Sequence, residues 1–173
     1  MPVKLTSAVT VPLEPPDFHH CEAALGFSEL GMFGDAEAEL ERIDPFNRAL
    51  PEVLRVRAAV YHGTANWDDL RAVALKLTRL EPANVQWPLS LAYATRRAAS
   101  IEFARDILLA AKEQFPSEPI ISFNLACYCC QLGDMDAAKE YLKQAFAIDL
   151  NLRQAALDDQ DLEPLWNFLN EVG

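Results

Sequence analysis

A period of 34 residues constrains the fold of this chain more than any other feature of its sequence. Small residues recur at this spacing in two columns: Ala24, Ala58, Ala92 and Ala126, and then Gly31, Ala65, Ala99 and Gly133. Apolar residues recur with the same period at Leu40, Ala74, Leu108 and Leu142. A repeat of this length corresponds to one supersecondary unit, and such a unit cannot bury its own apolar face. The copies must therefore stack on one another.

The stretch 123–150, FNLACYCCQLGDMDAAKEYLKQAFAIDL, contains the clearest copy of the unit. Its small residues are spaced by three, four or seven positions, which places them on one face of each of two helices: Ala126, Cys129 and Gly133 on the first, Ala138 and Ala145 on the second. Small side chains at a helix crossing allow an antiparallel pair to approach closely. The pattern therefore predicts two amphipathic helices joined near Gly133.

A 34-residue helix–turn–helix unit with small residues in these columns, and with Pro82 and Pro116 closing two copies, resembles the tetratricopeptide repeat (TPR). The resemblance covers four copies, at residues 17–50, 51–84, 85–118 and 119–150. It implies an all-α, right-handed superhelix, a TPR solenoid. In the first copy Asp44-Pro45 ends the second helix about one turn early. In the second, Arg57 replaces the usual leucine, and we expect the helix to turn Val56 inward and leave Arg57 partly exposed.

The two ends of the chain do not follow the repeat. Residues 1–16 contain four prolines and are predicted to form an extended or disordered tail. Alternatively, residues 8–13 lie along the domain's own surface or pair with a second chain. Residues 151–173 are predicted to form capping helices that cover the last repeat, with Trp166 buried against it. The alternative is that the final helix is an exposed ligand for a partner.

Helix starts are indicated by residues that can cap a helix with a side-chain oxygen. The sequence places Asp17, Asn66, Ser100 and Asp134 at four such starts. Because each precedes an amphipathic stretch, we expect their side chains to accept backbone N–H groups of the first turn.

Charge and cysteine content exclude several function classes. The net charge is −11, which argues against nucleic acid and anionic membrane surfaces as partners, because both require clustered positive charge. The N-terminus is a poor signal peptide, and no apolar stretch is long enough to span a membrane. The four cysteines do not form a disulfide framework. We expect a cytoplasmic protein.

In TPR proteins the first helices of successive repeats line a concave groove, which usually binds an extended peptide or a helix. Matched by column, the resemblance implies these groove residues here: Phe18, Leu25, Arg55, Ala59, His62, Leu89, Tyr93, Arg96, Phe123, Cys127 and Cys130, with Arg97 as a further cation beside them. The set is apolar and aromatic for a surface that should face water. The alternative is that the chain's own tail or a dimer mate covers it. Arg96 and Arg97 could contact an acidic peptide, or could belong to a solvated face paired with nearby glutamates.

The cysteine cluster Cys127, Cys129 and Cys130 contains a C-x-x-C spacing, which admits a metal or redox pair. A zinc site needs two further ligands, however, and the three histidines lie in other copies. We therefore interpret the cysteines as small packing residues. No catalytic triad, phosphate loop or metalloprotease motif is present. We expect no enzymatic activity, no metal and no cofactor.

These patterns predict a non-enzymatic module that binds a peptide or helix of another protein in its concave groove. Two other functions remain open. The chain could be a self-associating structural component, such as a homodimer, whose groove is filled by its own tail or by a dimer mate. It could also be a secretion chaperone, since some small acidic bacterial chaperones are TPR domains of similar length.

Overall fold

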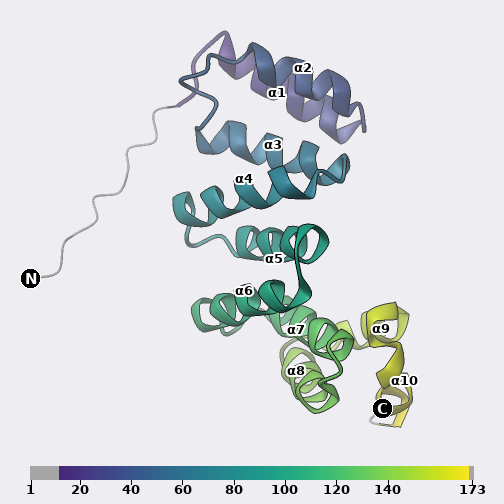
Figure 1. Cartoon of the computed structure of the whole chain (residues 1–173). Coiled ribbons are helices and arrows are strands. Elements are labelled where there is room, and N and C mark those ends of the chain that lie inside the picture. Colours follow the sequence, from purple (N-terminus) through teal and green to yellow (C-terminus); the bar gives the residue numbers. More distant parts are fainter. Residues whose placement is uncertain (1–11, 172–173) are drawn as a thin grey trace, which may run out of the picture. The chain divides into compact units, whose positions relative to one another are not determined.

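A computed structural model describes residues 12–171, and this part of the chain is helical and contains no strand (Figure 1). The helices are α1 (Asp17–Glu29), α2 (Phe33–Arg42), α3 (Pro51–Gly63), α4 (Trp67–Leu80), α5 (Gln86–Ala98), α6 (Ile101–Gln114), α7 (Pro119–Gln131), α8 (Met135–Ile148), α9 (Leu152–Asp158), the 3-10 helix η1 (Gln160–Leu165) and α10 (Trp166–Glu171). None of these helices combines the length and apolarity needed to cross a bilayer. Most of the predicted N-terminal tail, residues 1–11, lies outside the described residues.

The chain divides into two compact units, an N-terminal unit (Met1–Thr64) and a C-terminal unit (Ala65–Gly173). In the N-terminal unit α1 packs against α2, and α3 packs against both. In the C-terminal unit each helix from α4 to α8 packs against the next, and η1 packs against α7. The division falls between α3 and α4, within the second copy of the 34-residue pattern.

The small-residue columns lie at the helix contacts of both units. Ala24 and Ala36 are fully buried in the N-terminal core, where Leu40, Ile43 and Val53 fill the remaining space. The C-terminal core buries the equivalent alanines just as completely: Ala92, Ala104, Ala126 and Ala138. Since small side chains allow close helix approach, the period seen in the sequence is a packing period.

Three of the four predicted helix caps are confirmed. The side-chain oxygens of Asn66, Ser100 and Asp134 accept backbone N–H groups three residues later, at 3.5, 3.1 and 3.1 Å. The fourth prediction, for Asp17, is wrong. Pro16 is the N-cap residue of α1, and Asp17 is already inside the helix.

The C-terminal helices pack on the core of their unit. Leu162, Leu165 and Leu169 are almost completely buried among residues of α7 and α8, and Leu157 packs beside them. Trp166 also packs on this core but is only half-buried, so the expectation of a buried tryptophan holds in part.

Candidate functional site

The first candidate surface lies in the N-terminal unit, along the faces of α1 and α3. Phe18, Cys21 and Leu25 are three and four residues apart and therefore share one face of α1. They border an apolar pocket of about 420 Å³, termed here the α1–α3 pocket, whose lining residues are Pro12, Leu13, Phe18, Cys21, Glu22, Leu25, Glu52, Arg55 and Val56. Phe18 and Leu25 are 40% and 44% exposed. The structure thus brings Phe18, Leu25 and Arg55 together, as their columns predict.

The other two groove residues predicted for the N-terminal unit follow Arg55 along α3. Ala59 and His62 are both exposed, and neither lines the α1–α3 pocket. They extend the accessible face of the helix beyond the pocket.

Polar contacts to the linker between α2 and α3 hold the two walls of the pocket in place. The Asp17 carboxylate accepts the backbone N–H of Asp44 at 3.1 and 3.2 Å and the Asn47 amide at 2.8 Å. This explains why Asp17 does not cap its own helix. The hydrogen bond from Asn47, helped by Asp44 and His20, lowers the pKa of Asp17 against the opposing effect of burial. The start of α1 is therefore tied to the segment that leads into α3.

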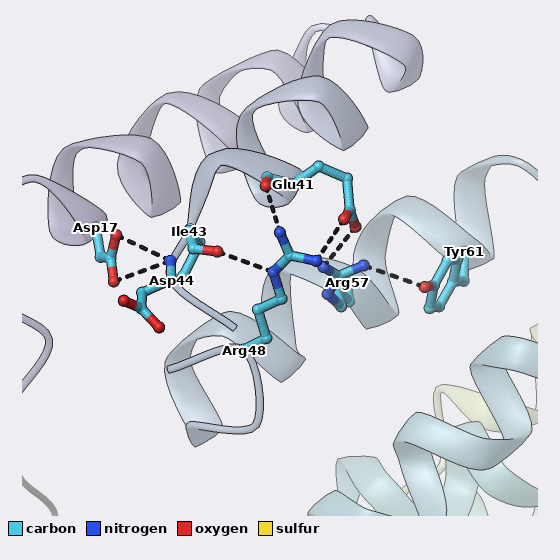
Figure 2. A network of polar contacts seen from close by, with 7 residues as sticks. All are labelled: Asp17, Glu41, Ile43, Asp44, Arg48, Arg57 and Tyr61. Atoms are coloured by element: carbon cyan, nitrogen blue, oxygen red, sulfur yellow. Dashed lines mark hydrogen bonds and ion pairs between the residues drawn. The ribbon is translucent and has the colours of Figure 1, made fainter. Parts of the chain in front are cut away.

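Figure 2 shows the second part of this network, in which two arginines share one carboxylate. Glu41 accepts Nη1 of Arg48 at 2.6 Å and Nη2 of Arg57 at 2.8 Å, and Arg48 Nε donates to the carbonyl of Ile43 at 2.8 Å. The Arg57 side chain is 15% exposed. Its hydrogen bond lowers the pKa of Glu41.

Arg57 departs from the repeat pattern as expected. Val56 is turned inward and is 5% exposed, while the neighbouring arginine is partly buried. A carboxylate accompanies it, because a buried charge needs a partner. The sequence did not indicate that this partner is Glu41.

The second candidate surface lies in the C-terminal unit, between α5 on one side and α9 with the acidic residues at and after its end on the other. A polar pocket of about 630 Å³ is lined by Tyr93, Arg96, Arg97, Ala155, Asp158, Asp159, Gln160 and Asp161. Tyr93 is 39% exposed and meets the Trp67 ring edge to face, with centroids 5.5 Å apart. Arg97 lies over the same Trp67 ring at 5.2 Å. Leu89, one turn before Tyr93, is half-buried and packs on the core.

Arg96 is held by a carboxylate of its own chain. Its two terminal nitrogens bond the two oxygens of Asp161, with Nη2 to Oδ1 at 2.8 Å, and its guanidinium lies 5.2 Å from the centre of the Tyr128 ring. The hydrogen bonds that Arg96 donates to the Asp161 carboxylate raise the pKa of Arg96. The partner of Arg96 is therefore an aspartate distant in sequence. The charge of Arg96 is paired without a nearby glutamate or an acidic peptide.

Comparison with solved structures identifies the fold. A structure titled MamA AMB-1 aligns with a TM-score of 0.65 and 18% identity over 90% of both chains. A second MamA AMB-1 structure gives 0.63 and 17% over 91% of this chain and 98% of that one. MamA MSR-1 gives 0.54 and 15% over 80% and 99%. MamA is a TPR protein.

This chain has the TPR fold. The all-α fold class and the resemblance found in the sequence are thereby confirmed. At these identities the likeness establishes the fold and nothing about a shared partner. No protein-family model matches the sequence, and no curated protein matches it either.

The last copy of the TPR pattern corrects one part of the predicted groove. Phe123, Cys127 and Cys130 were expected to face a groove, but they are buried, with 6%, 3% and 3% exposure. The residues that follow α9 cover this face of α7, since Cys127 Sγ donates to Asp159 Oδ2 at 3.6 Å and Gln131 donates to the Asp161 carbonyl at 3.0 Å. The expected exposure of these three side chains is therefore wrong.

The cover comes from a segment that sequence reasoning assigned only to the end of the solenoid. The chain's tail and a dimer mate were the coverings considered, whereas the structure uses Asp159–Leu165. The available signal was the acidic run 158–161 followed by Leu162 and Leu165, which could have been matched to Arg96 and the apolar face of α7.

The cysteines of the TPR core behave as packing residues. All four in the chain are free and buried. Burial raises the pKa of the Cys127, Cys129 and Cys130 thiols, so their reactive thiolate forms are disfavoured at neutral pH. Within residues 12–171 no cluster of three His, Cys, Asp or Glu residues is arranged to hold a metal ion.

Proposed function

We propose that this chain is a non-enzymatic interaction module that holds a peptide or helix of a partner protein against its first-helix faces. The observation that carries the proposal is the exposure of Phe18, Leu25 and Tyr93. These large side chains occupy the columns that line the groove in the TPR fold, and two of them border an apolar pocket. Apolar side chains gathered at the surface in this way mark an interaction site.

The side chains divide into anchors and a polar rim. Phe18 and Leu25 are the anchors of the N-terminal unit and Tyr93 is the anchor of the C-terminal unit, because apolar and aromatic side chains in pockets dominate binding energies. Arg55 and Arg97, with His62, orient the partner and select its polarity. Phe123, Cys127 and Cys130 support the surface from within the core.

The same proposal places the protein in the cytoplasm, where it acts as an adaptor. Its four cysteines are free thiols, a state that a reducing compartment maintains. This assignment rests on the cysteines alone.

Selection of a random peptide library on the immobilised full-length chain tests the proposal. We expect enriched peptides that bind the wild-type chain and bind Phe18→Ser/Leu25→Ser at least about tenfold more weakly, a loss of about 1.4 kcal/mol. Helical circular dichroism should be the same for both chains, because both substituted side chains are partly exposed and lie outside the buried core. Failure to enrich any peptide, or equal binding to the variant, would contradict the proposed function.

A further inference from the structure

The α1–α3 pocket lies where the described chain begins. Pro12 and Leu13 form part of its wall, together with Phe18 and Leu25. Leu13 is 9% exposed and packs in the same apolar cluster as Cys21 and Val56. The segment that precedes Pro12 is therefore tethered to the rim of this pocket.

The pocket offers one buried acceptor in an apolar lining. Glu52 Oε2 is buried and has no hydrogen-bond partner among the described residues. A buried polar atom without a partner is unfavourable, so an occupant that brings an N–H or O–H group would be stabilised there. An occupant of this pocket should combine apolar side chains with an unpaired backbone donor.

Residues 8–11, Ala-Val-Thr-Val, have this chemistry. Val11 precedes a proline and is therefore restricted to extended backbone, and β-branched Val9 and Thr10 also favour it. In an extended chain alternate side chains point to the same side. In an extended segment Val9 and Val11 would therefore lie on the same side as Leu13, which is buried against the unit, and Thr10 would lie on the other side.

The length of this segment also matches the length of the pocket wall formed by α1. Phe18 to Leu25 spans seven residues of helix, about 10 Å at 1.5 Å per residue. Val9 to Pro12 spans three extended steps, also about 10 Å at 3.3 Å per residue. The short segment next to Pro12 is thus long enough to run along the α1 wall without a linker.

We propose that residues 8–11 occupy the α1–α3 pocket of their own chain, with Val9 and Val11 against Phe18 and Leu25 and a backbone N–H on Glu52. The evidence for this occupancy is the pocket itself and the covalent link of the segment to Pro12 in its wall. Its consequence rests on the proposed function: the segment is an intramolecular competitor for the part of the surface that a partner would use. A tethered segment competes strongly because its effective concentration is high.

Alkylation of Cys21 in the full-length chain tests the occupancy. Cys21 lines the pocket and is the only cysteine among residues 1–64, so mass spectrometry after iodoacetamide treatment reports this site alone. In Val9→Asp/Val11→Asp we expect Cys21 to react about tenfold faster than in the wild type, the factor that corresponds to 1.4 kcal/mol. The matched variant Ala8→Asp/Thr10→Asp adds the same charges on the opposite side of the segment and should leave the rate unchanged.

Three results would overturn the inference. The first is an equal Cys21 rate in Val9→Asp/Val11→Asp and wild type, and the second is an equal increase in both aspartate variants. The third is a wild-type rate that rises on dilution, because a second copy would then be the occupant. Unchanged helical circular dichroism excludes unfolding as the cause of any increase. If the segment protects Cys21 but the library yields no binding peptide, the proposed function is refuted and this inference stands. If the library yields binding peptides but the segment does not protect Cys21, this inference is refuted and the proposed function stands.

Discussion

Arg96 on α5 and Asp161 in η1 form a two-point ion pair across 65 residues of sequence. The pair joins the end of a first helix to the segment that covers α7. Asp159, two residues earlier, accepts both the Cys127 thiol and the backbone N–H of Asp161, at 3.6 and 2.9 Å. One acidic turn therefore positions an arginine of the candidate surface and closes the apolar face beside it.

Removal of the Asp161 charge should destabilise the C-terminal unit. We expect Asp161→Asn to lower its free energy of unfolding by about 1–2 kcal/mol, since the paired side chains are about one-quarter exposed and solvent screens them in part. Urea unfolding followed by tryptophan fluorescence measures this unit alone, because all three tryptophans, Trp67, Trp87 and Trp166, lie within it. The matched control, Asp158→Asn, alters an exposed aspartate of the same turn and should change the midpoint little.

A substitution at Phe123 distinguishes a buried side chain, as the structure shows, from a groove-facing one, as the repeat columns predicted. Because Phe123 is buried, Phe123→Ala should destabilise the C-terminal unit by about 3–5 kcal/mol, with loss of packing and a cavity as the cause. Tyr93→Ala on the neighbouring exposed face should have a much smaller effect. A Phe123→Ala chain with wild-type stability in the same tryptophan-monitored urea titration would contradict the burial of Phe123.

The contrast between these residues shows what a repeat pattern can predict. The columns identified which residues share a face, so the buried alanines, the caps at Ser100 and Asp134, and the grouping of Phe18, Leu25 and Arg55 followed from spacing. They could not reveal that Asp159–Leu165 covers the face at Cys127, because that segment lies outside the repeat. The partners of Asp17 and Arg57 were missed for a similar reason, since a long-range pair leaves no local periodicity.

The column that contains Gly31, Ala65, Ala99 and Gly133 shows the same limit of the repeat pattern for backbone conformation. Gly31 and Gly133 have positive φ values of 74° and 83°, as does Ala65 at 54°. Ala99, in the same column, has a φ of −133°. The repeat placed these four positions in one column, but the two alanines adopt different backbones, and residue type alone does not separate them.

Gly63 marks a close approach of α3 to Phe33 on α2. A Cβ atom at this position would overlap the Phe33 ring, so Gly63→Ala should destabilise the N-terminal unit by about 1–3 kcal/mol. Hydrogen-exchange mass spectrometry of peptides from α1 to α3 measures the change. Gly34→Ala is the matched control, because its Cβ would meet nothing, and it should be neutral or mildly stabilising. A second substitution, Phe33→Leu, should recover part of the loss; no recovery would place the strain elsewhere.

Acid should weaken the N-terminal unit first. Hydrogen bonds from Asn47, His20 and Arg57 lower the pKa values of Asp17, Glu39 and Glu41, respectively, below ordinary values of 3.8 for Asp and 4.5 for Glu. Carboxyls with lowered pKa stabilise the fold above those ordinary values, and this contribution is lost as pH falls through the folded-state pKa. Hydrogen exchange in α1–α3 should therefore rise more steeply below about pH 4 than tryptophan-monitored unfolding of the other unit.

Substitution of the carboxyls provides the control for the acid response. Asp17→Asn and Glu41→Gln should reduce the pH dependence of the N-terminal unit, since neither amide titrates. An unchanged acid response in both variants would assign it to other groups.

The central claim is that a partner docks on the first-helix faces, and the most direct measurement is the dissociation constant of a selected peptide for three full-length chains. The chains are the wild type, the first-helix variant Phe18→Ser/Leu25→Ser, and Phe103→Ser/Leu109→Ser, which alters comparably exposed side chains on α6. We predict at least about a tenfold loss of affinity for the first-helix variant and wild-type affinity for the α6 variant. Wild-type affinity in the first-helix variant, or a loss confined to the α6 variant, would contradict the claim.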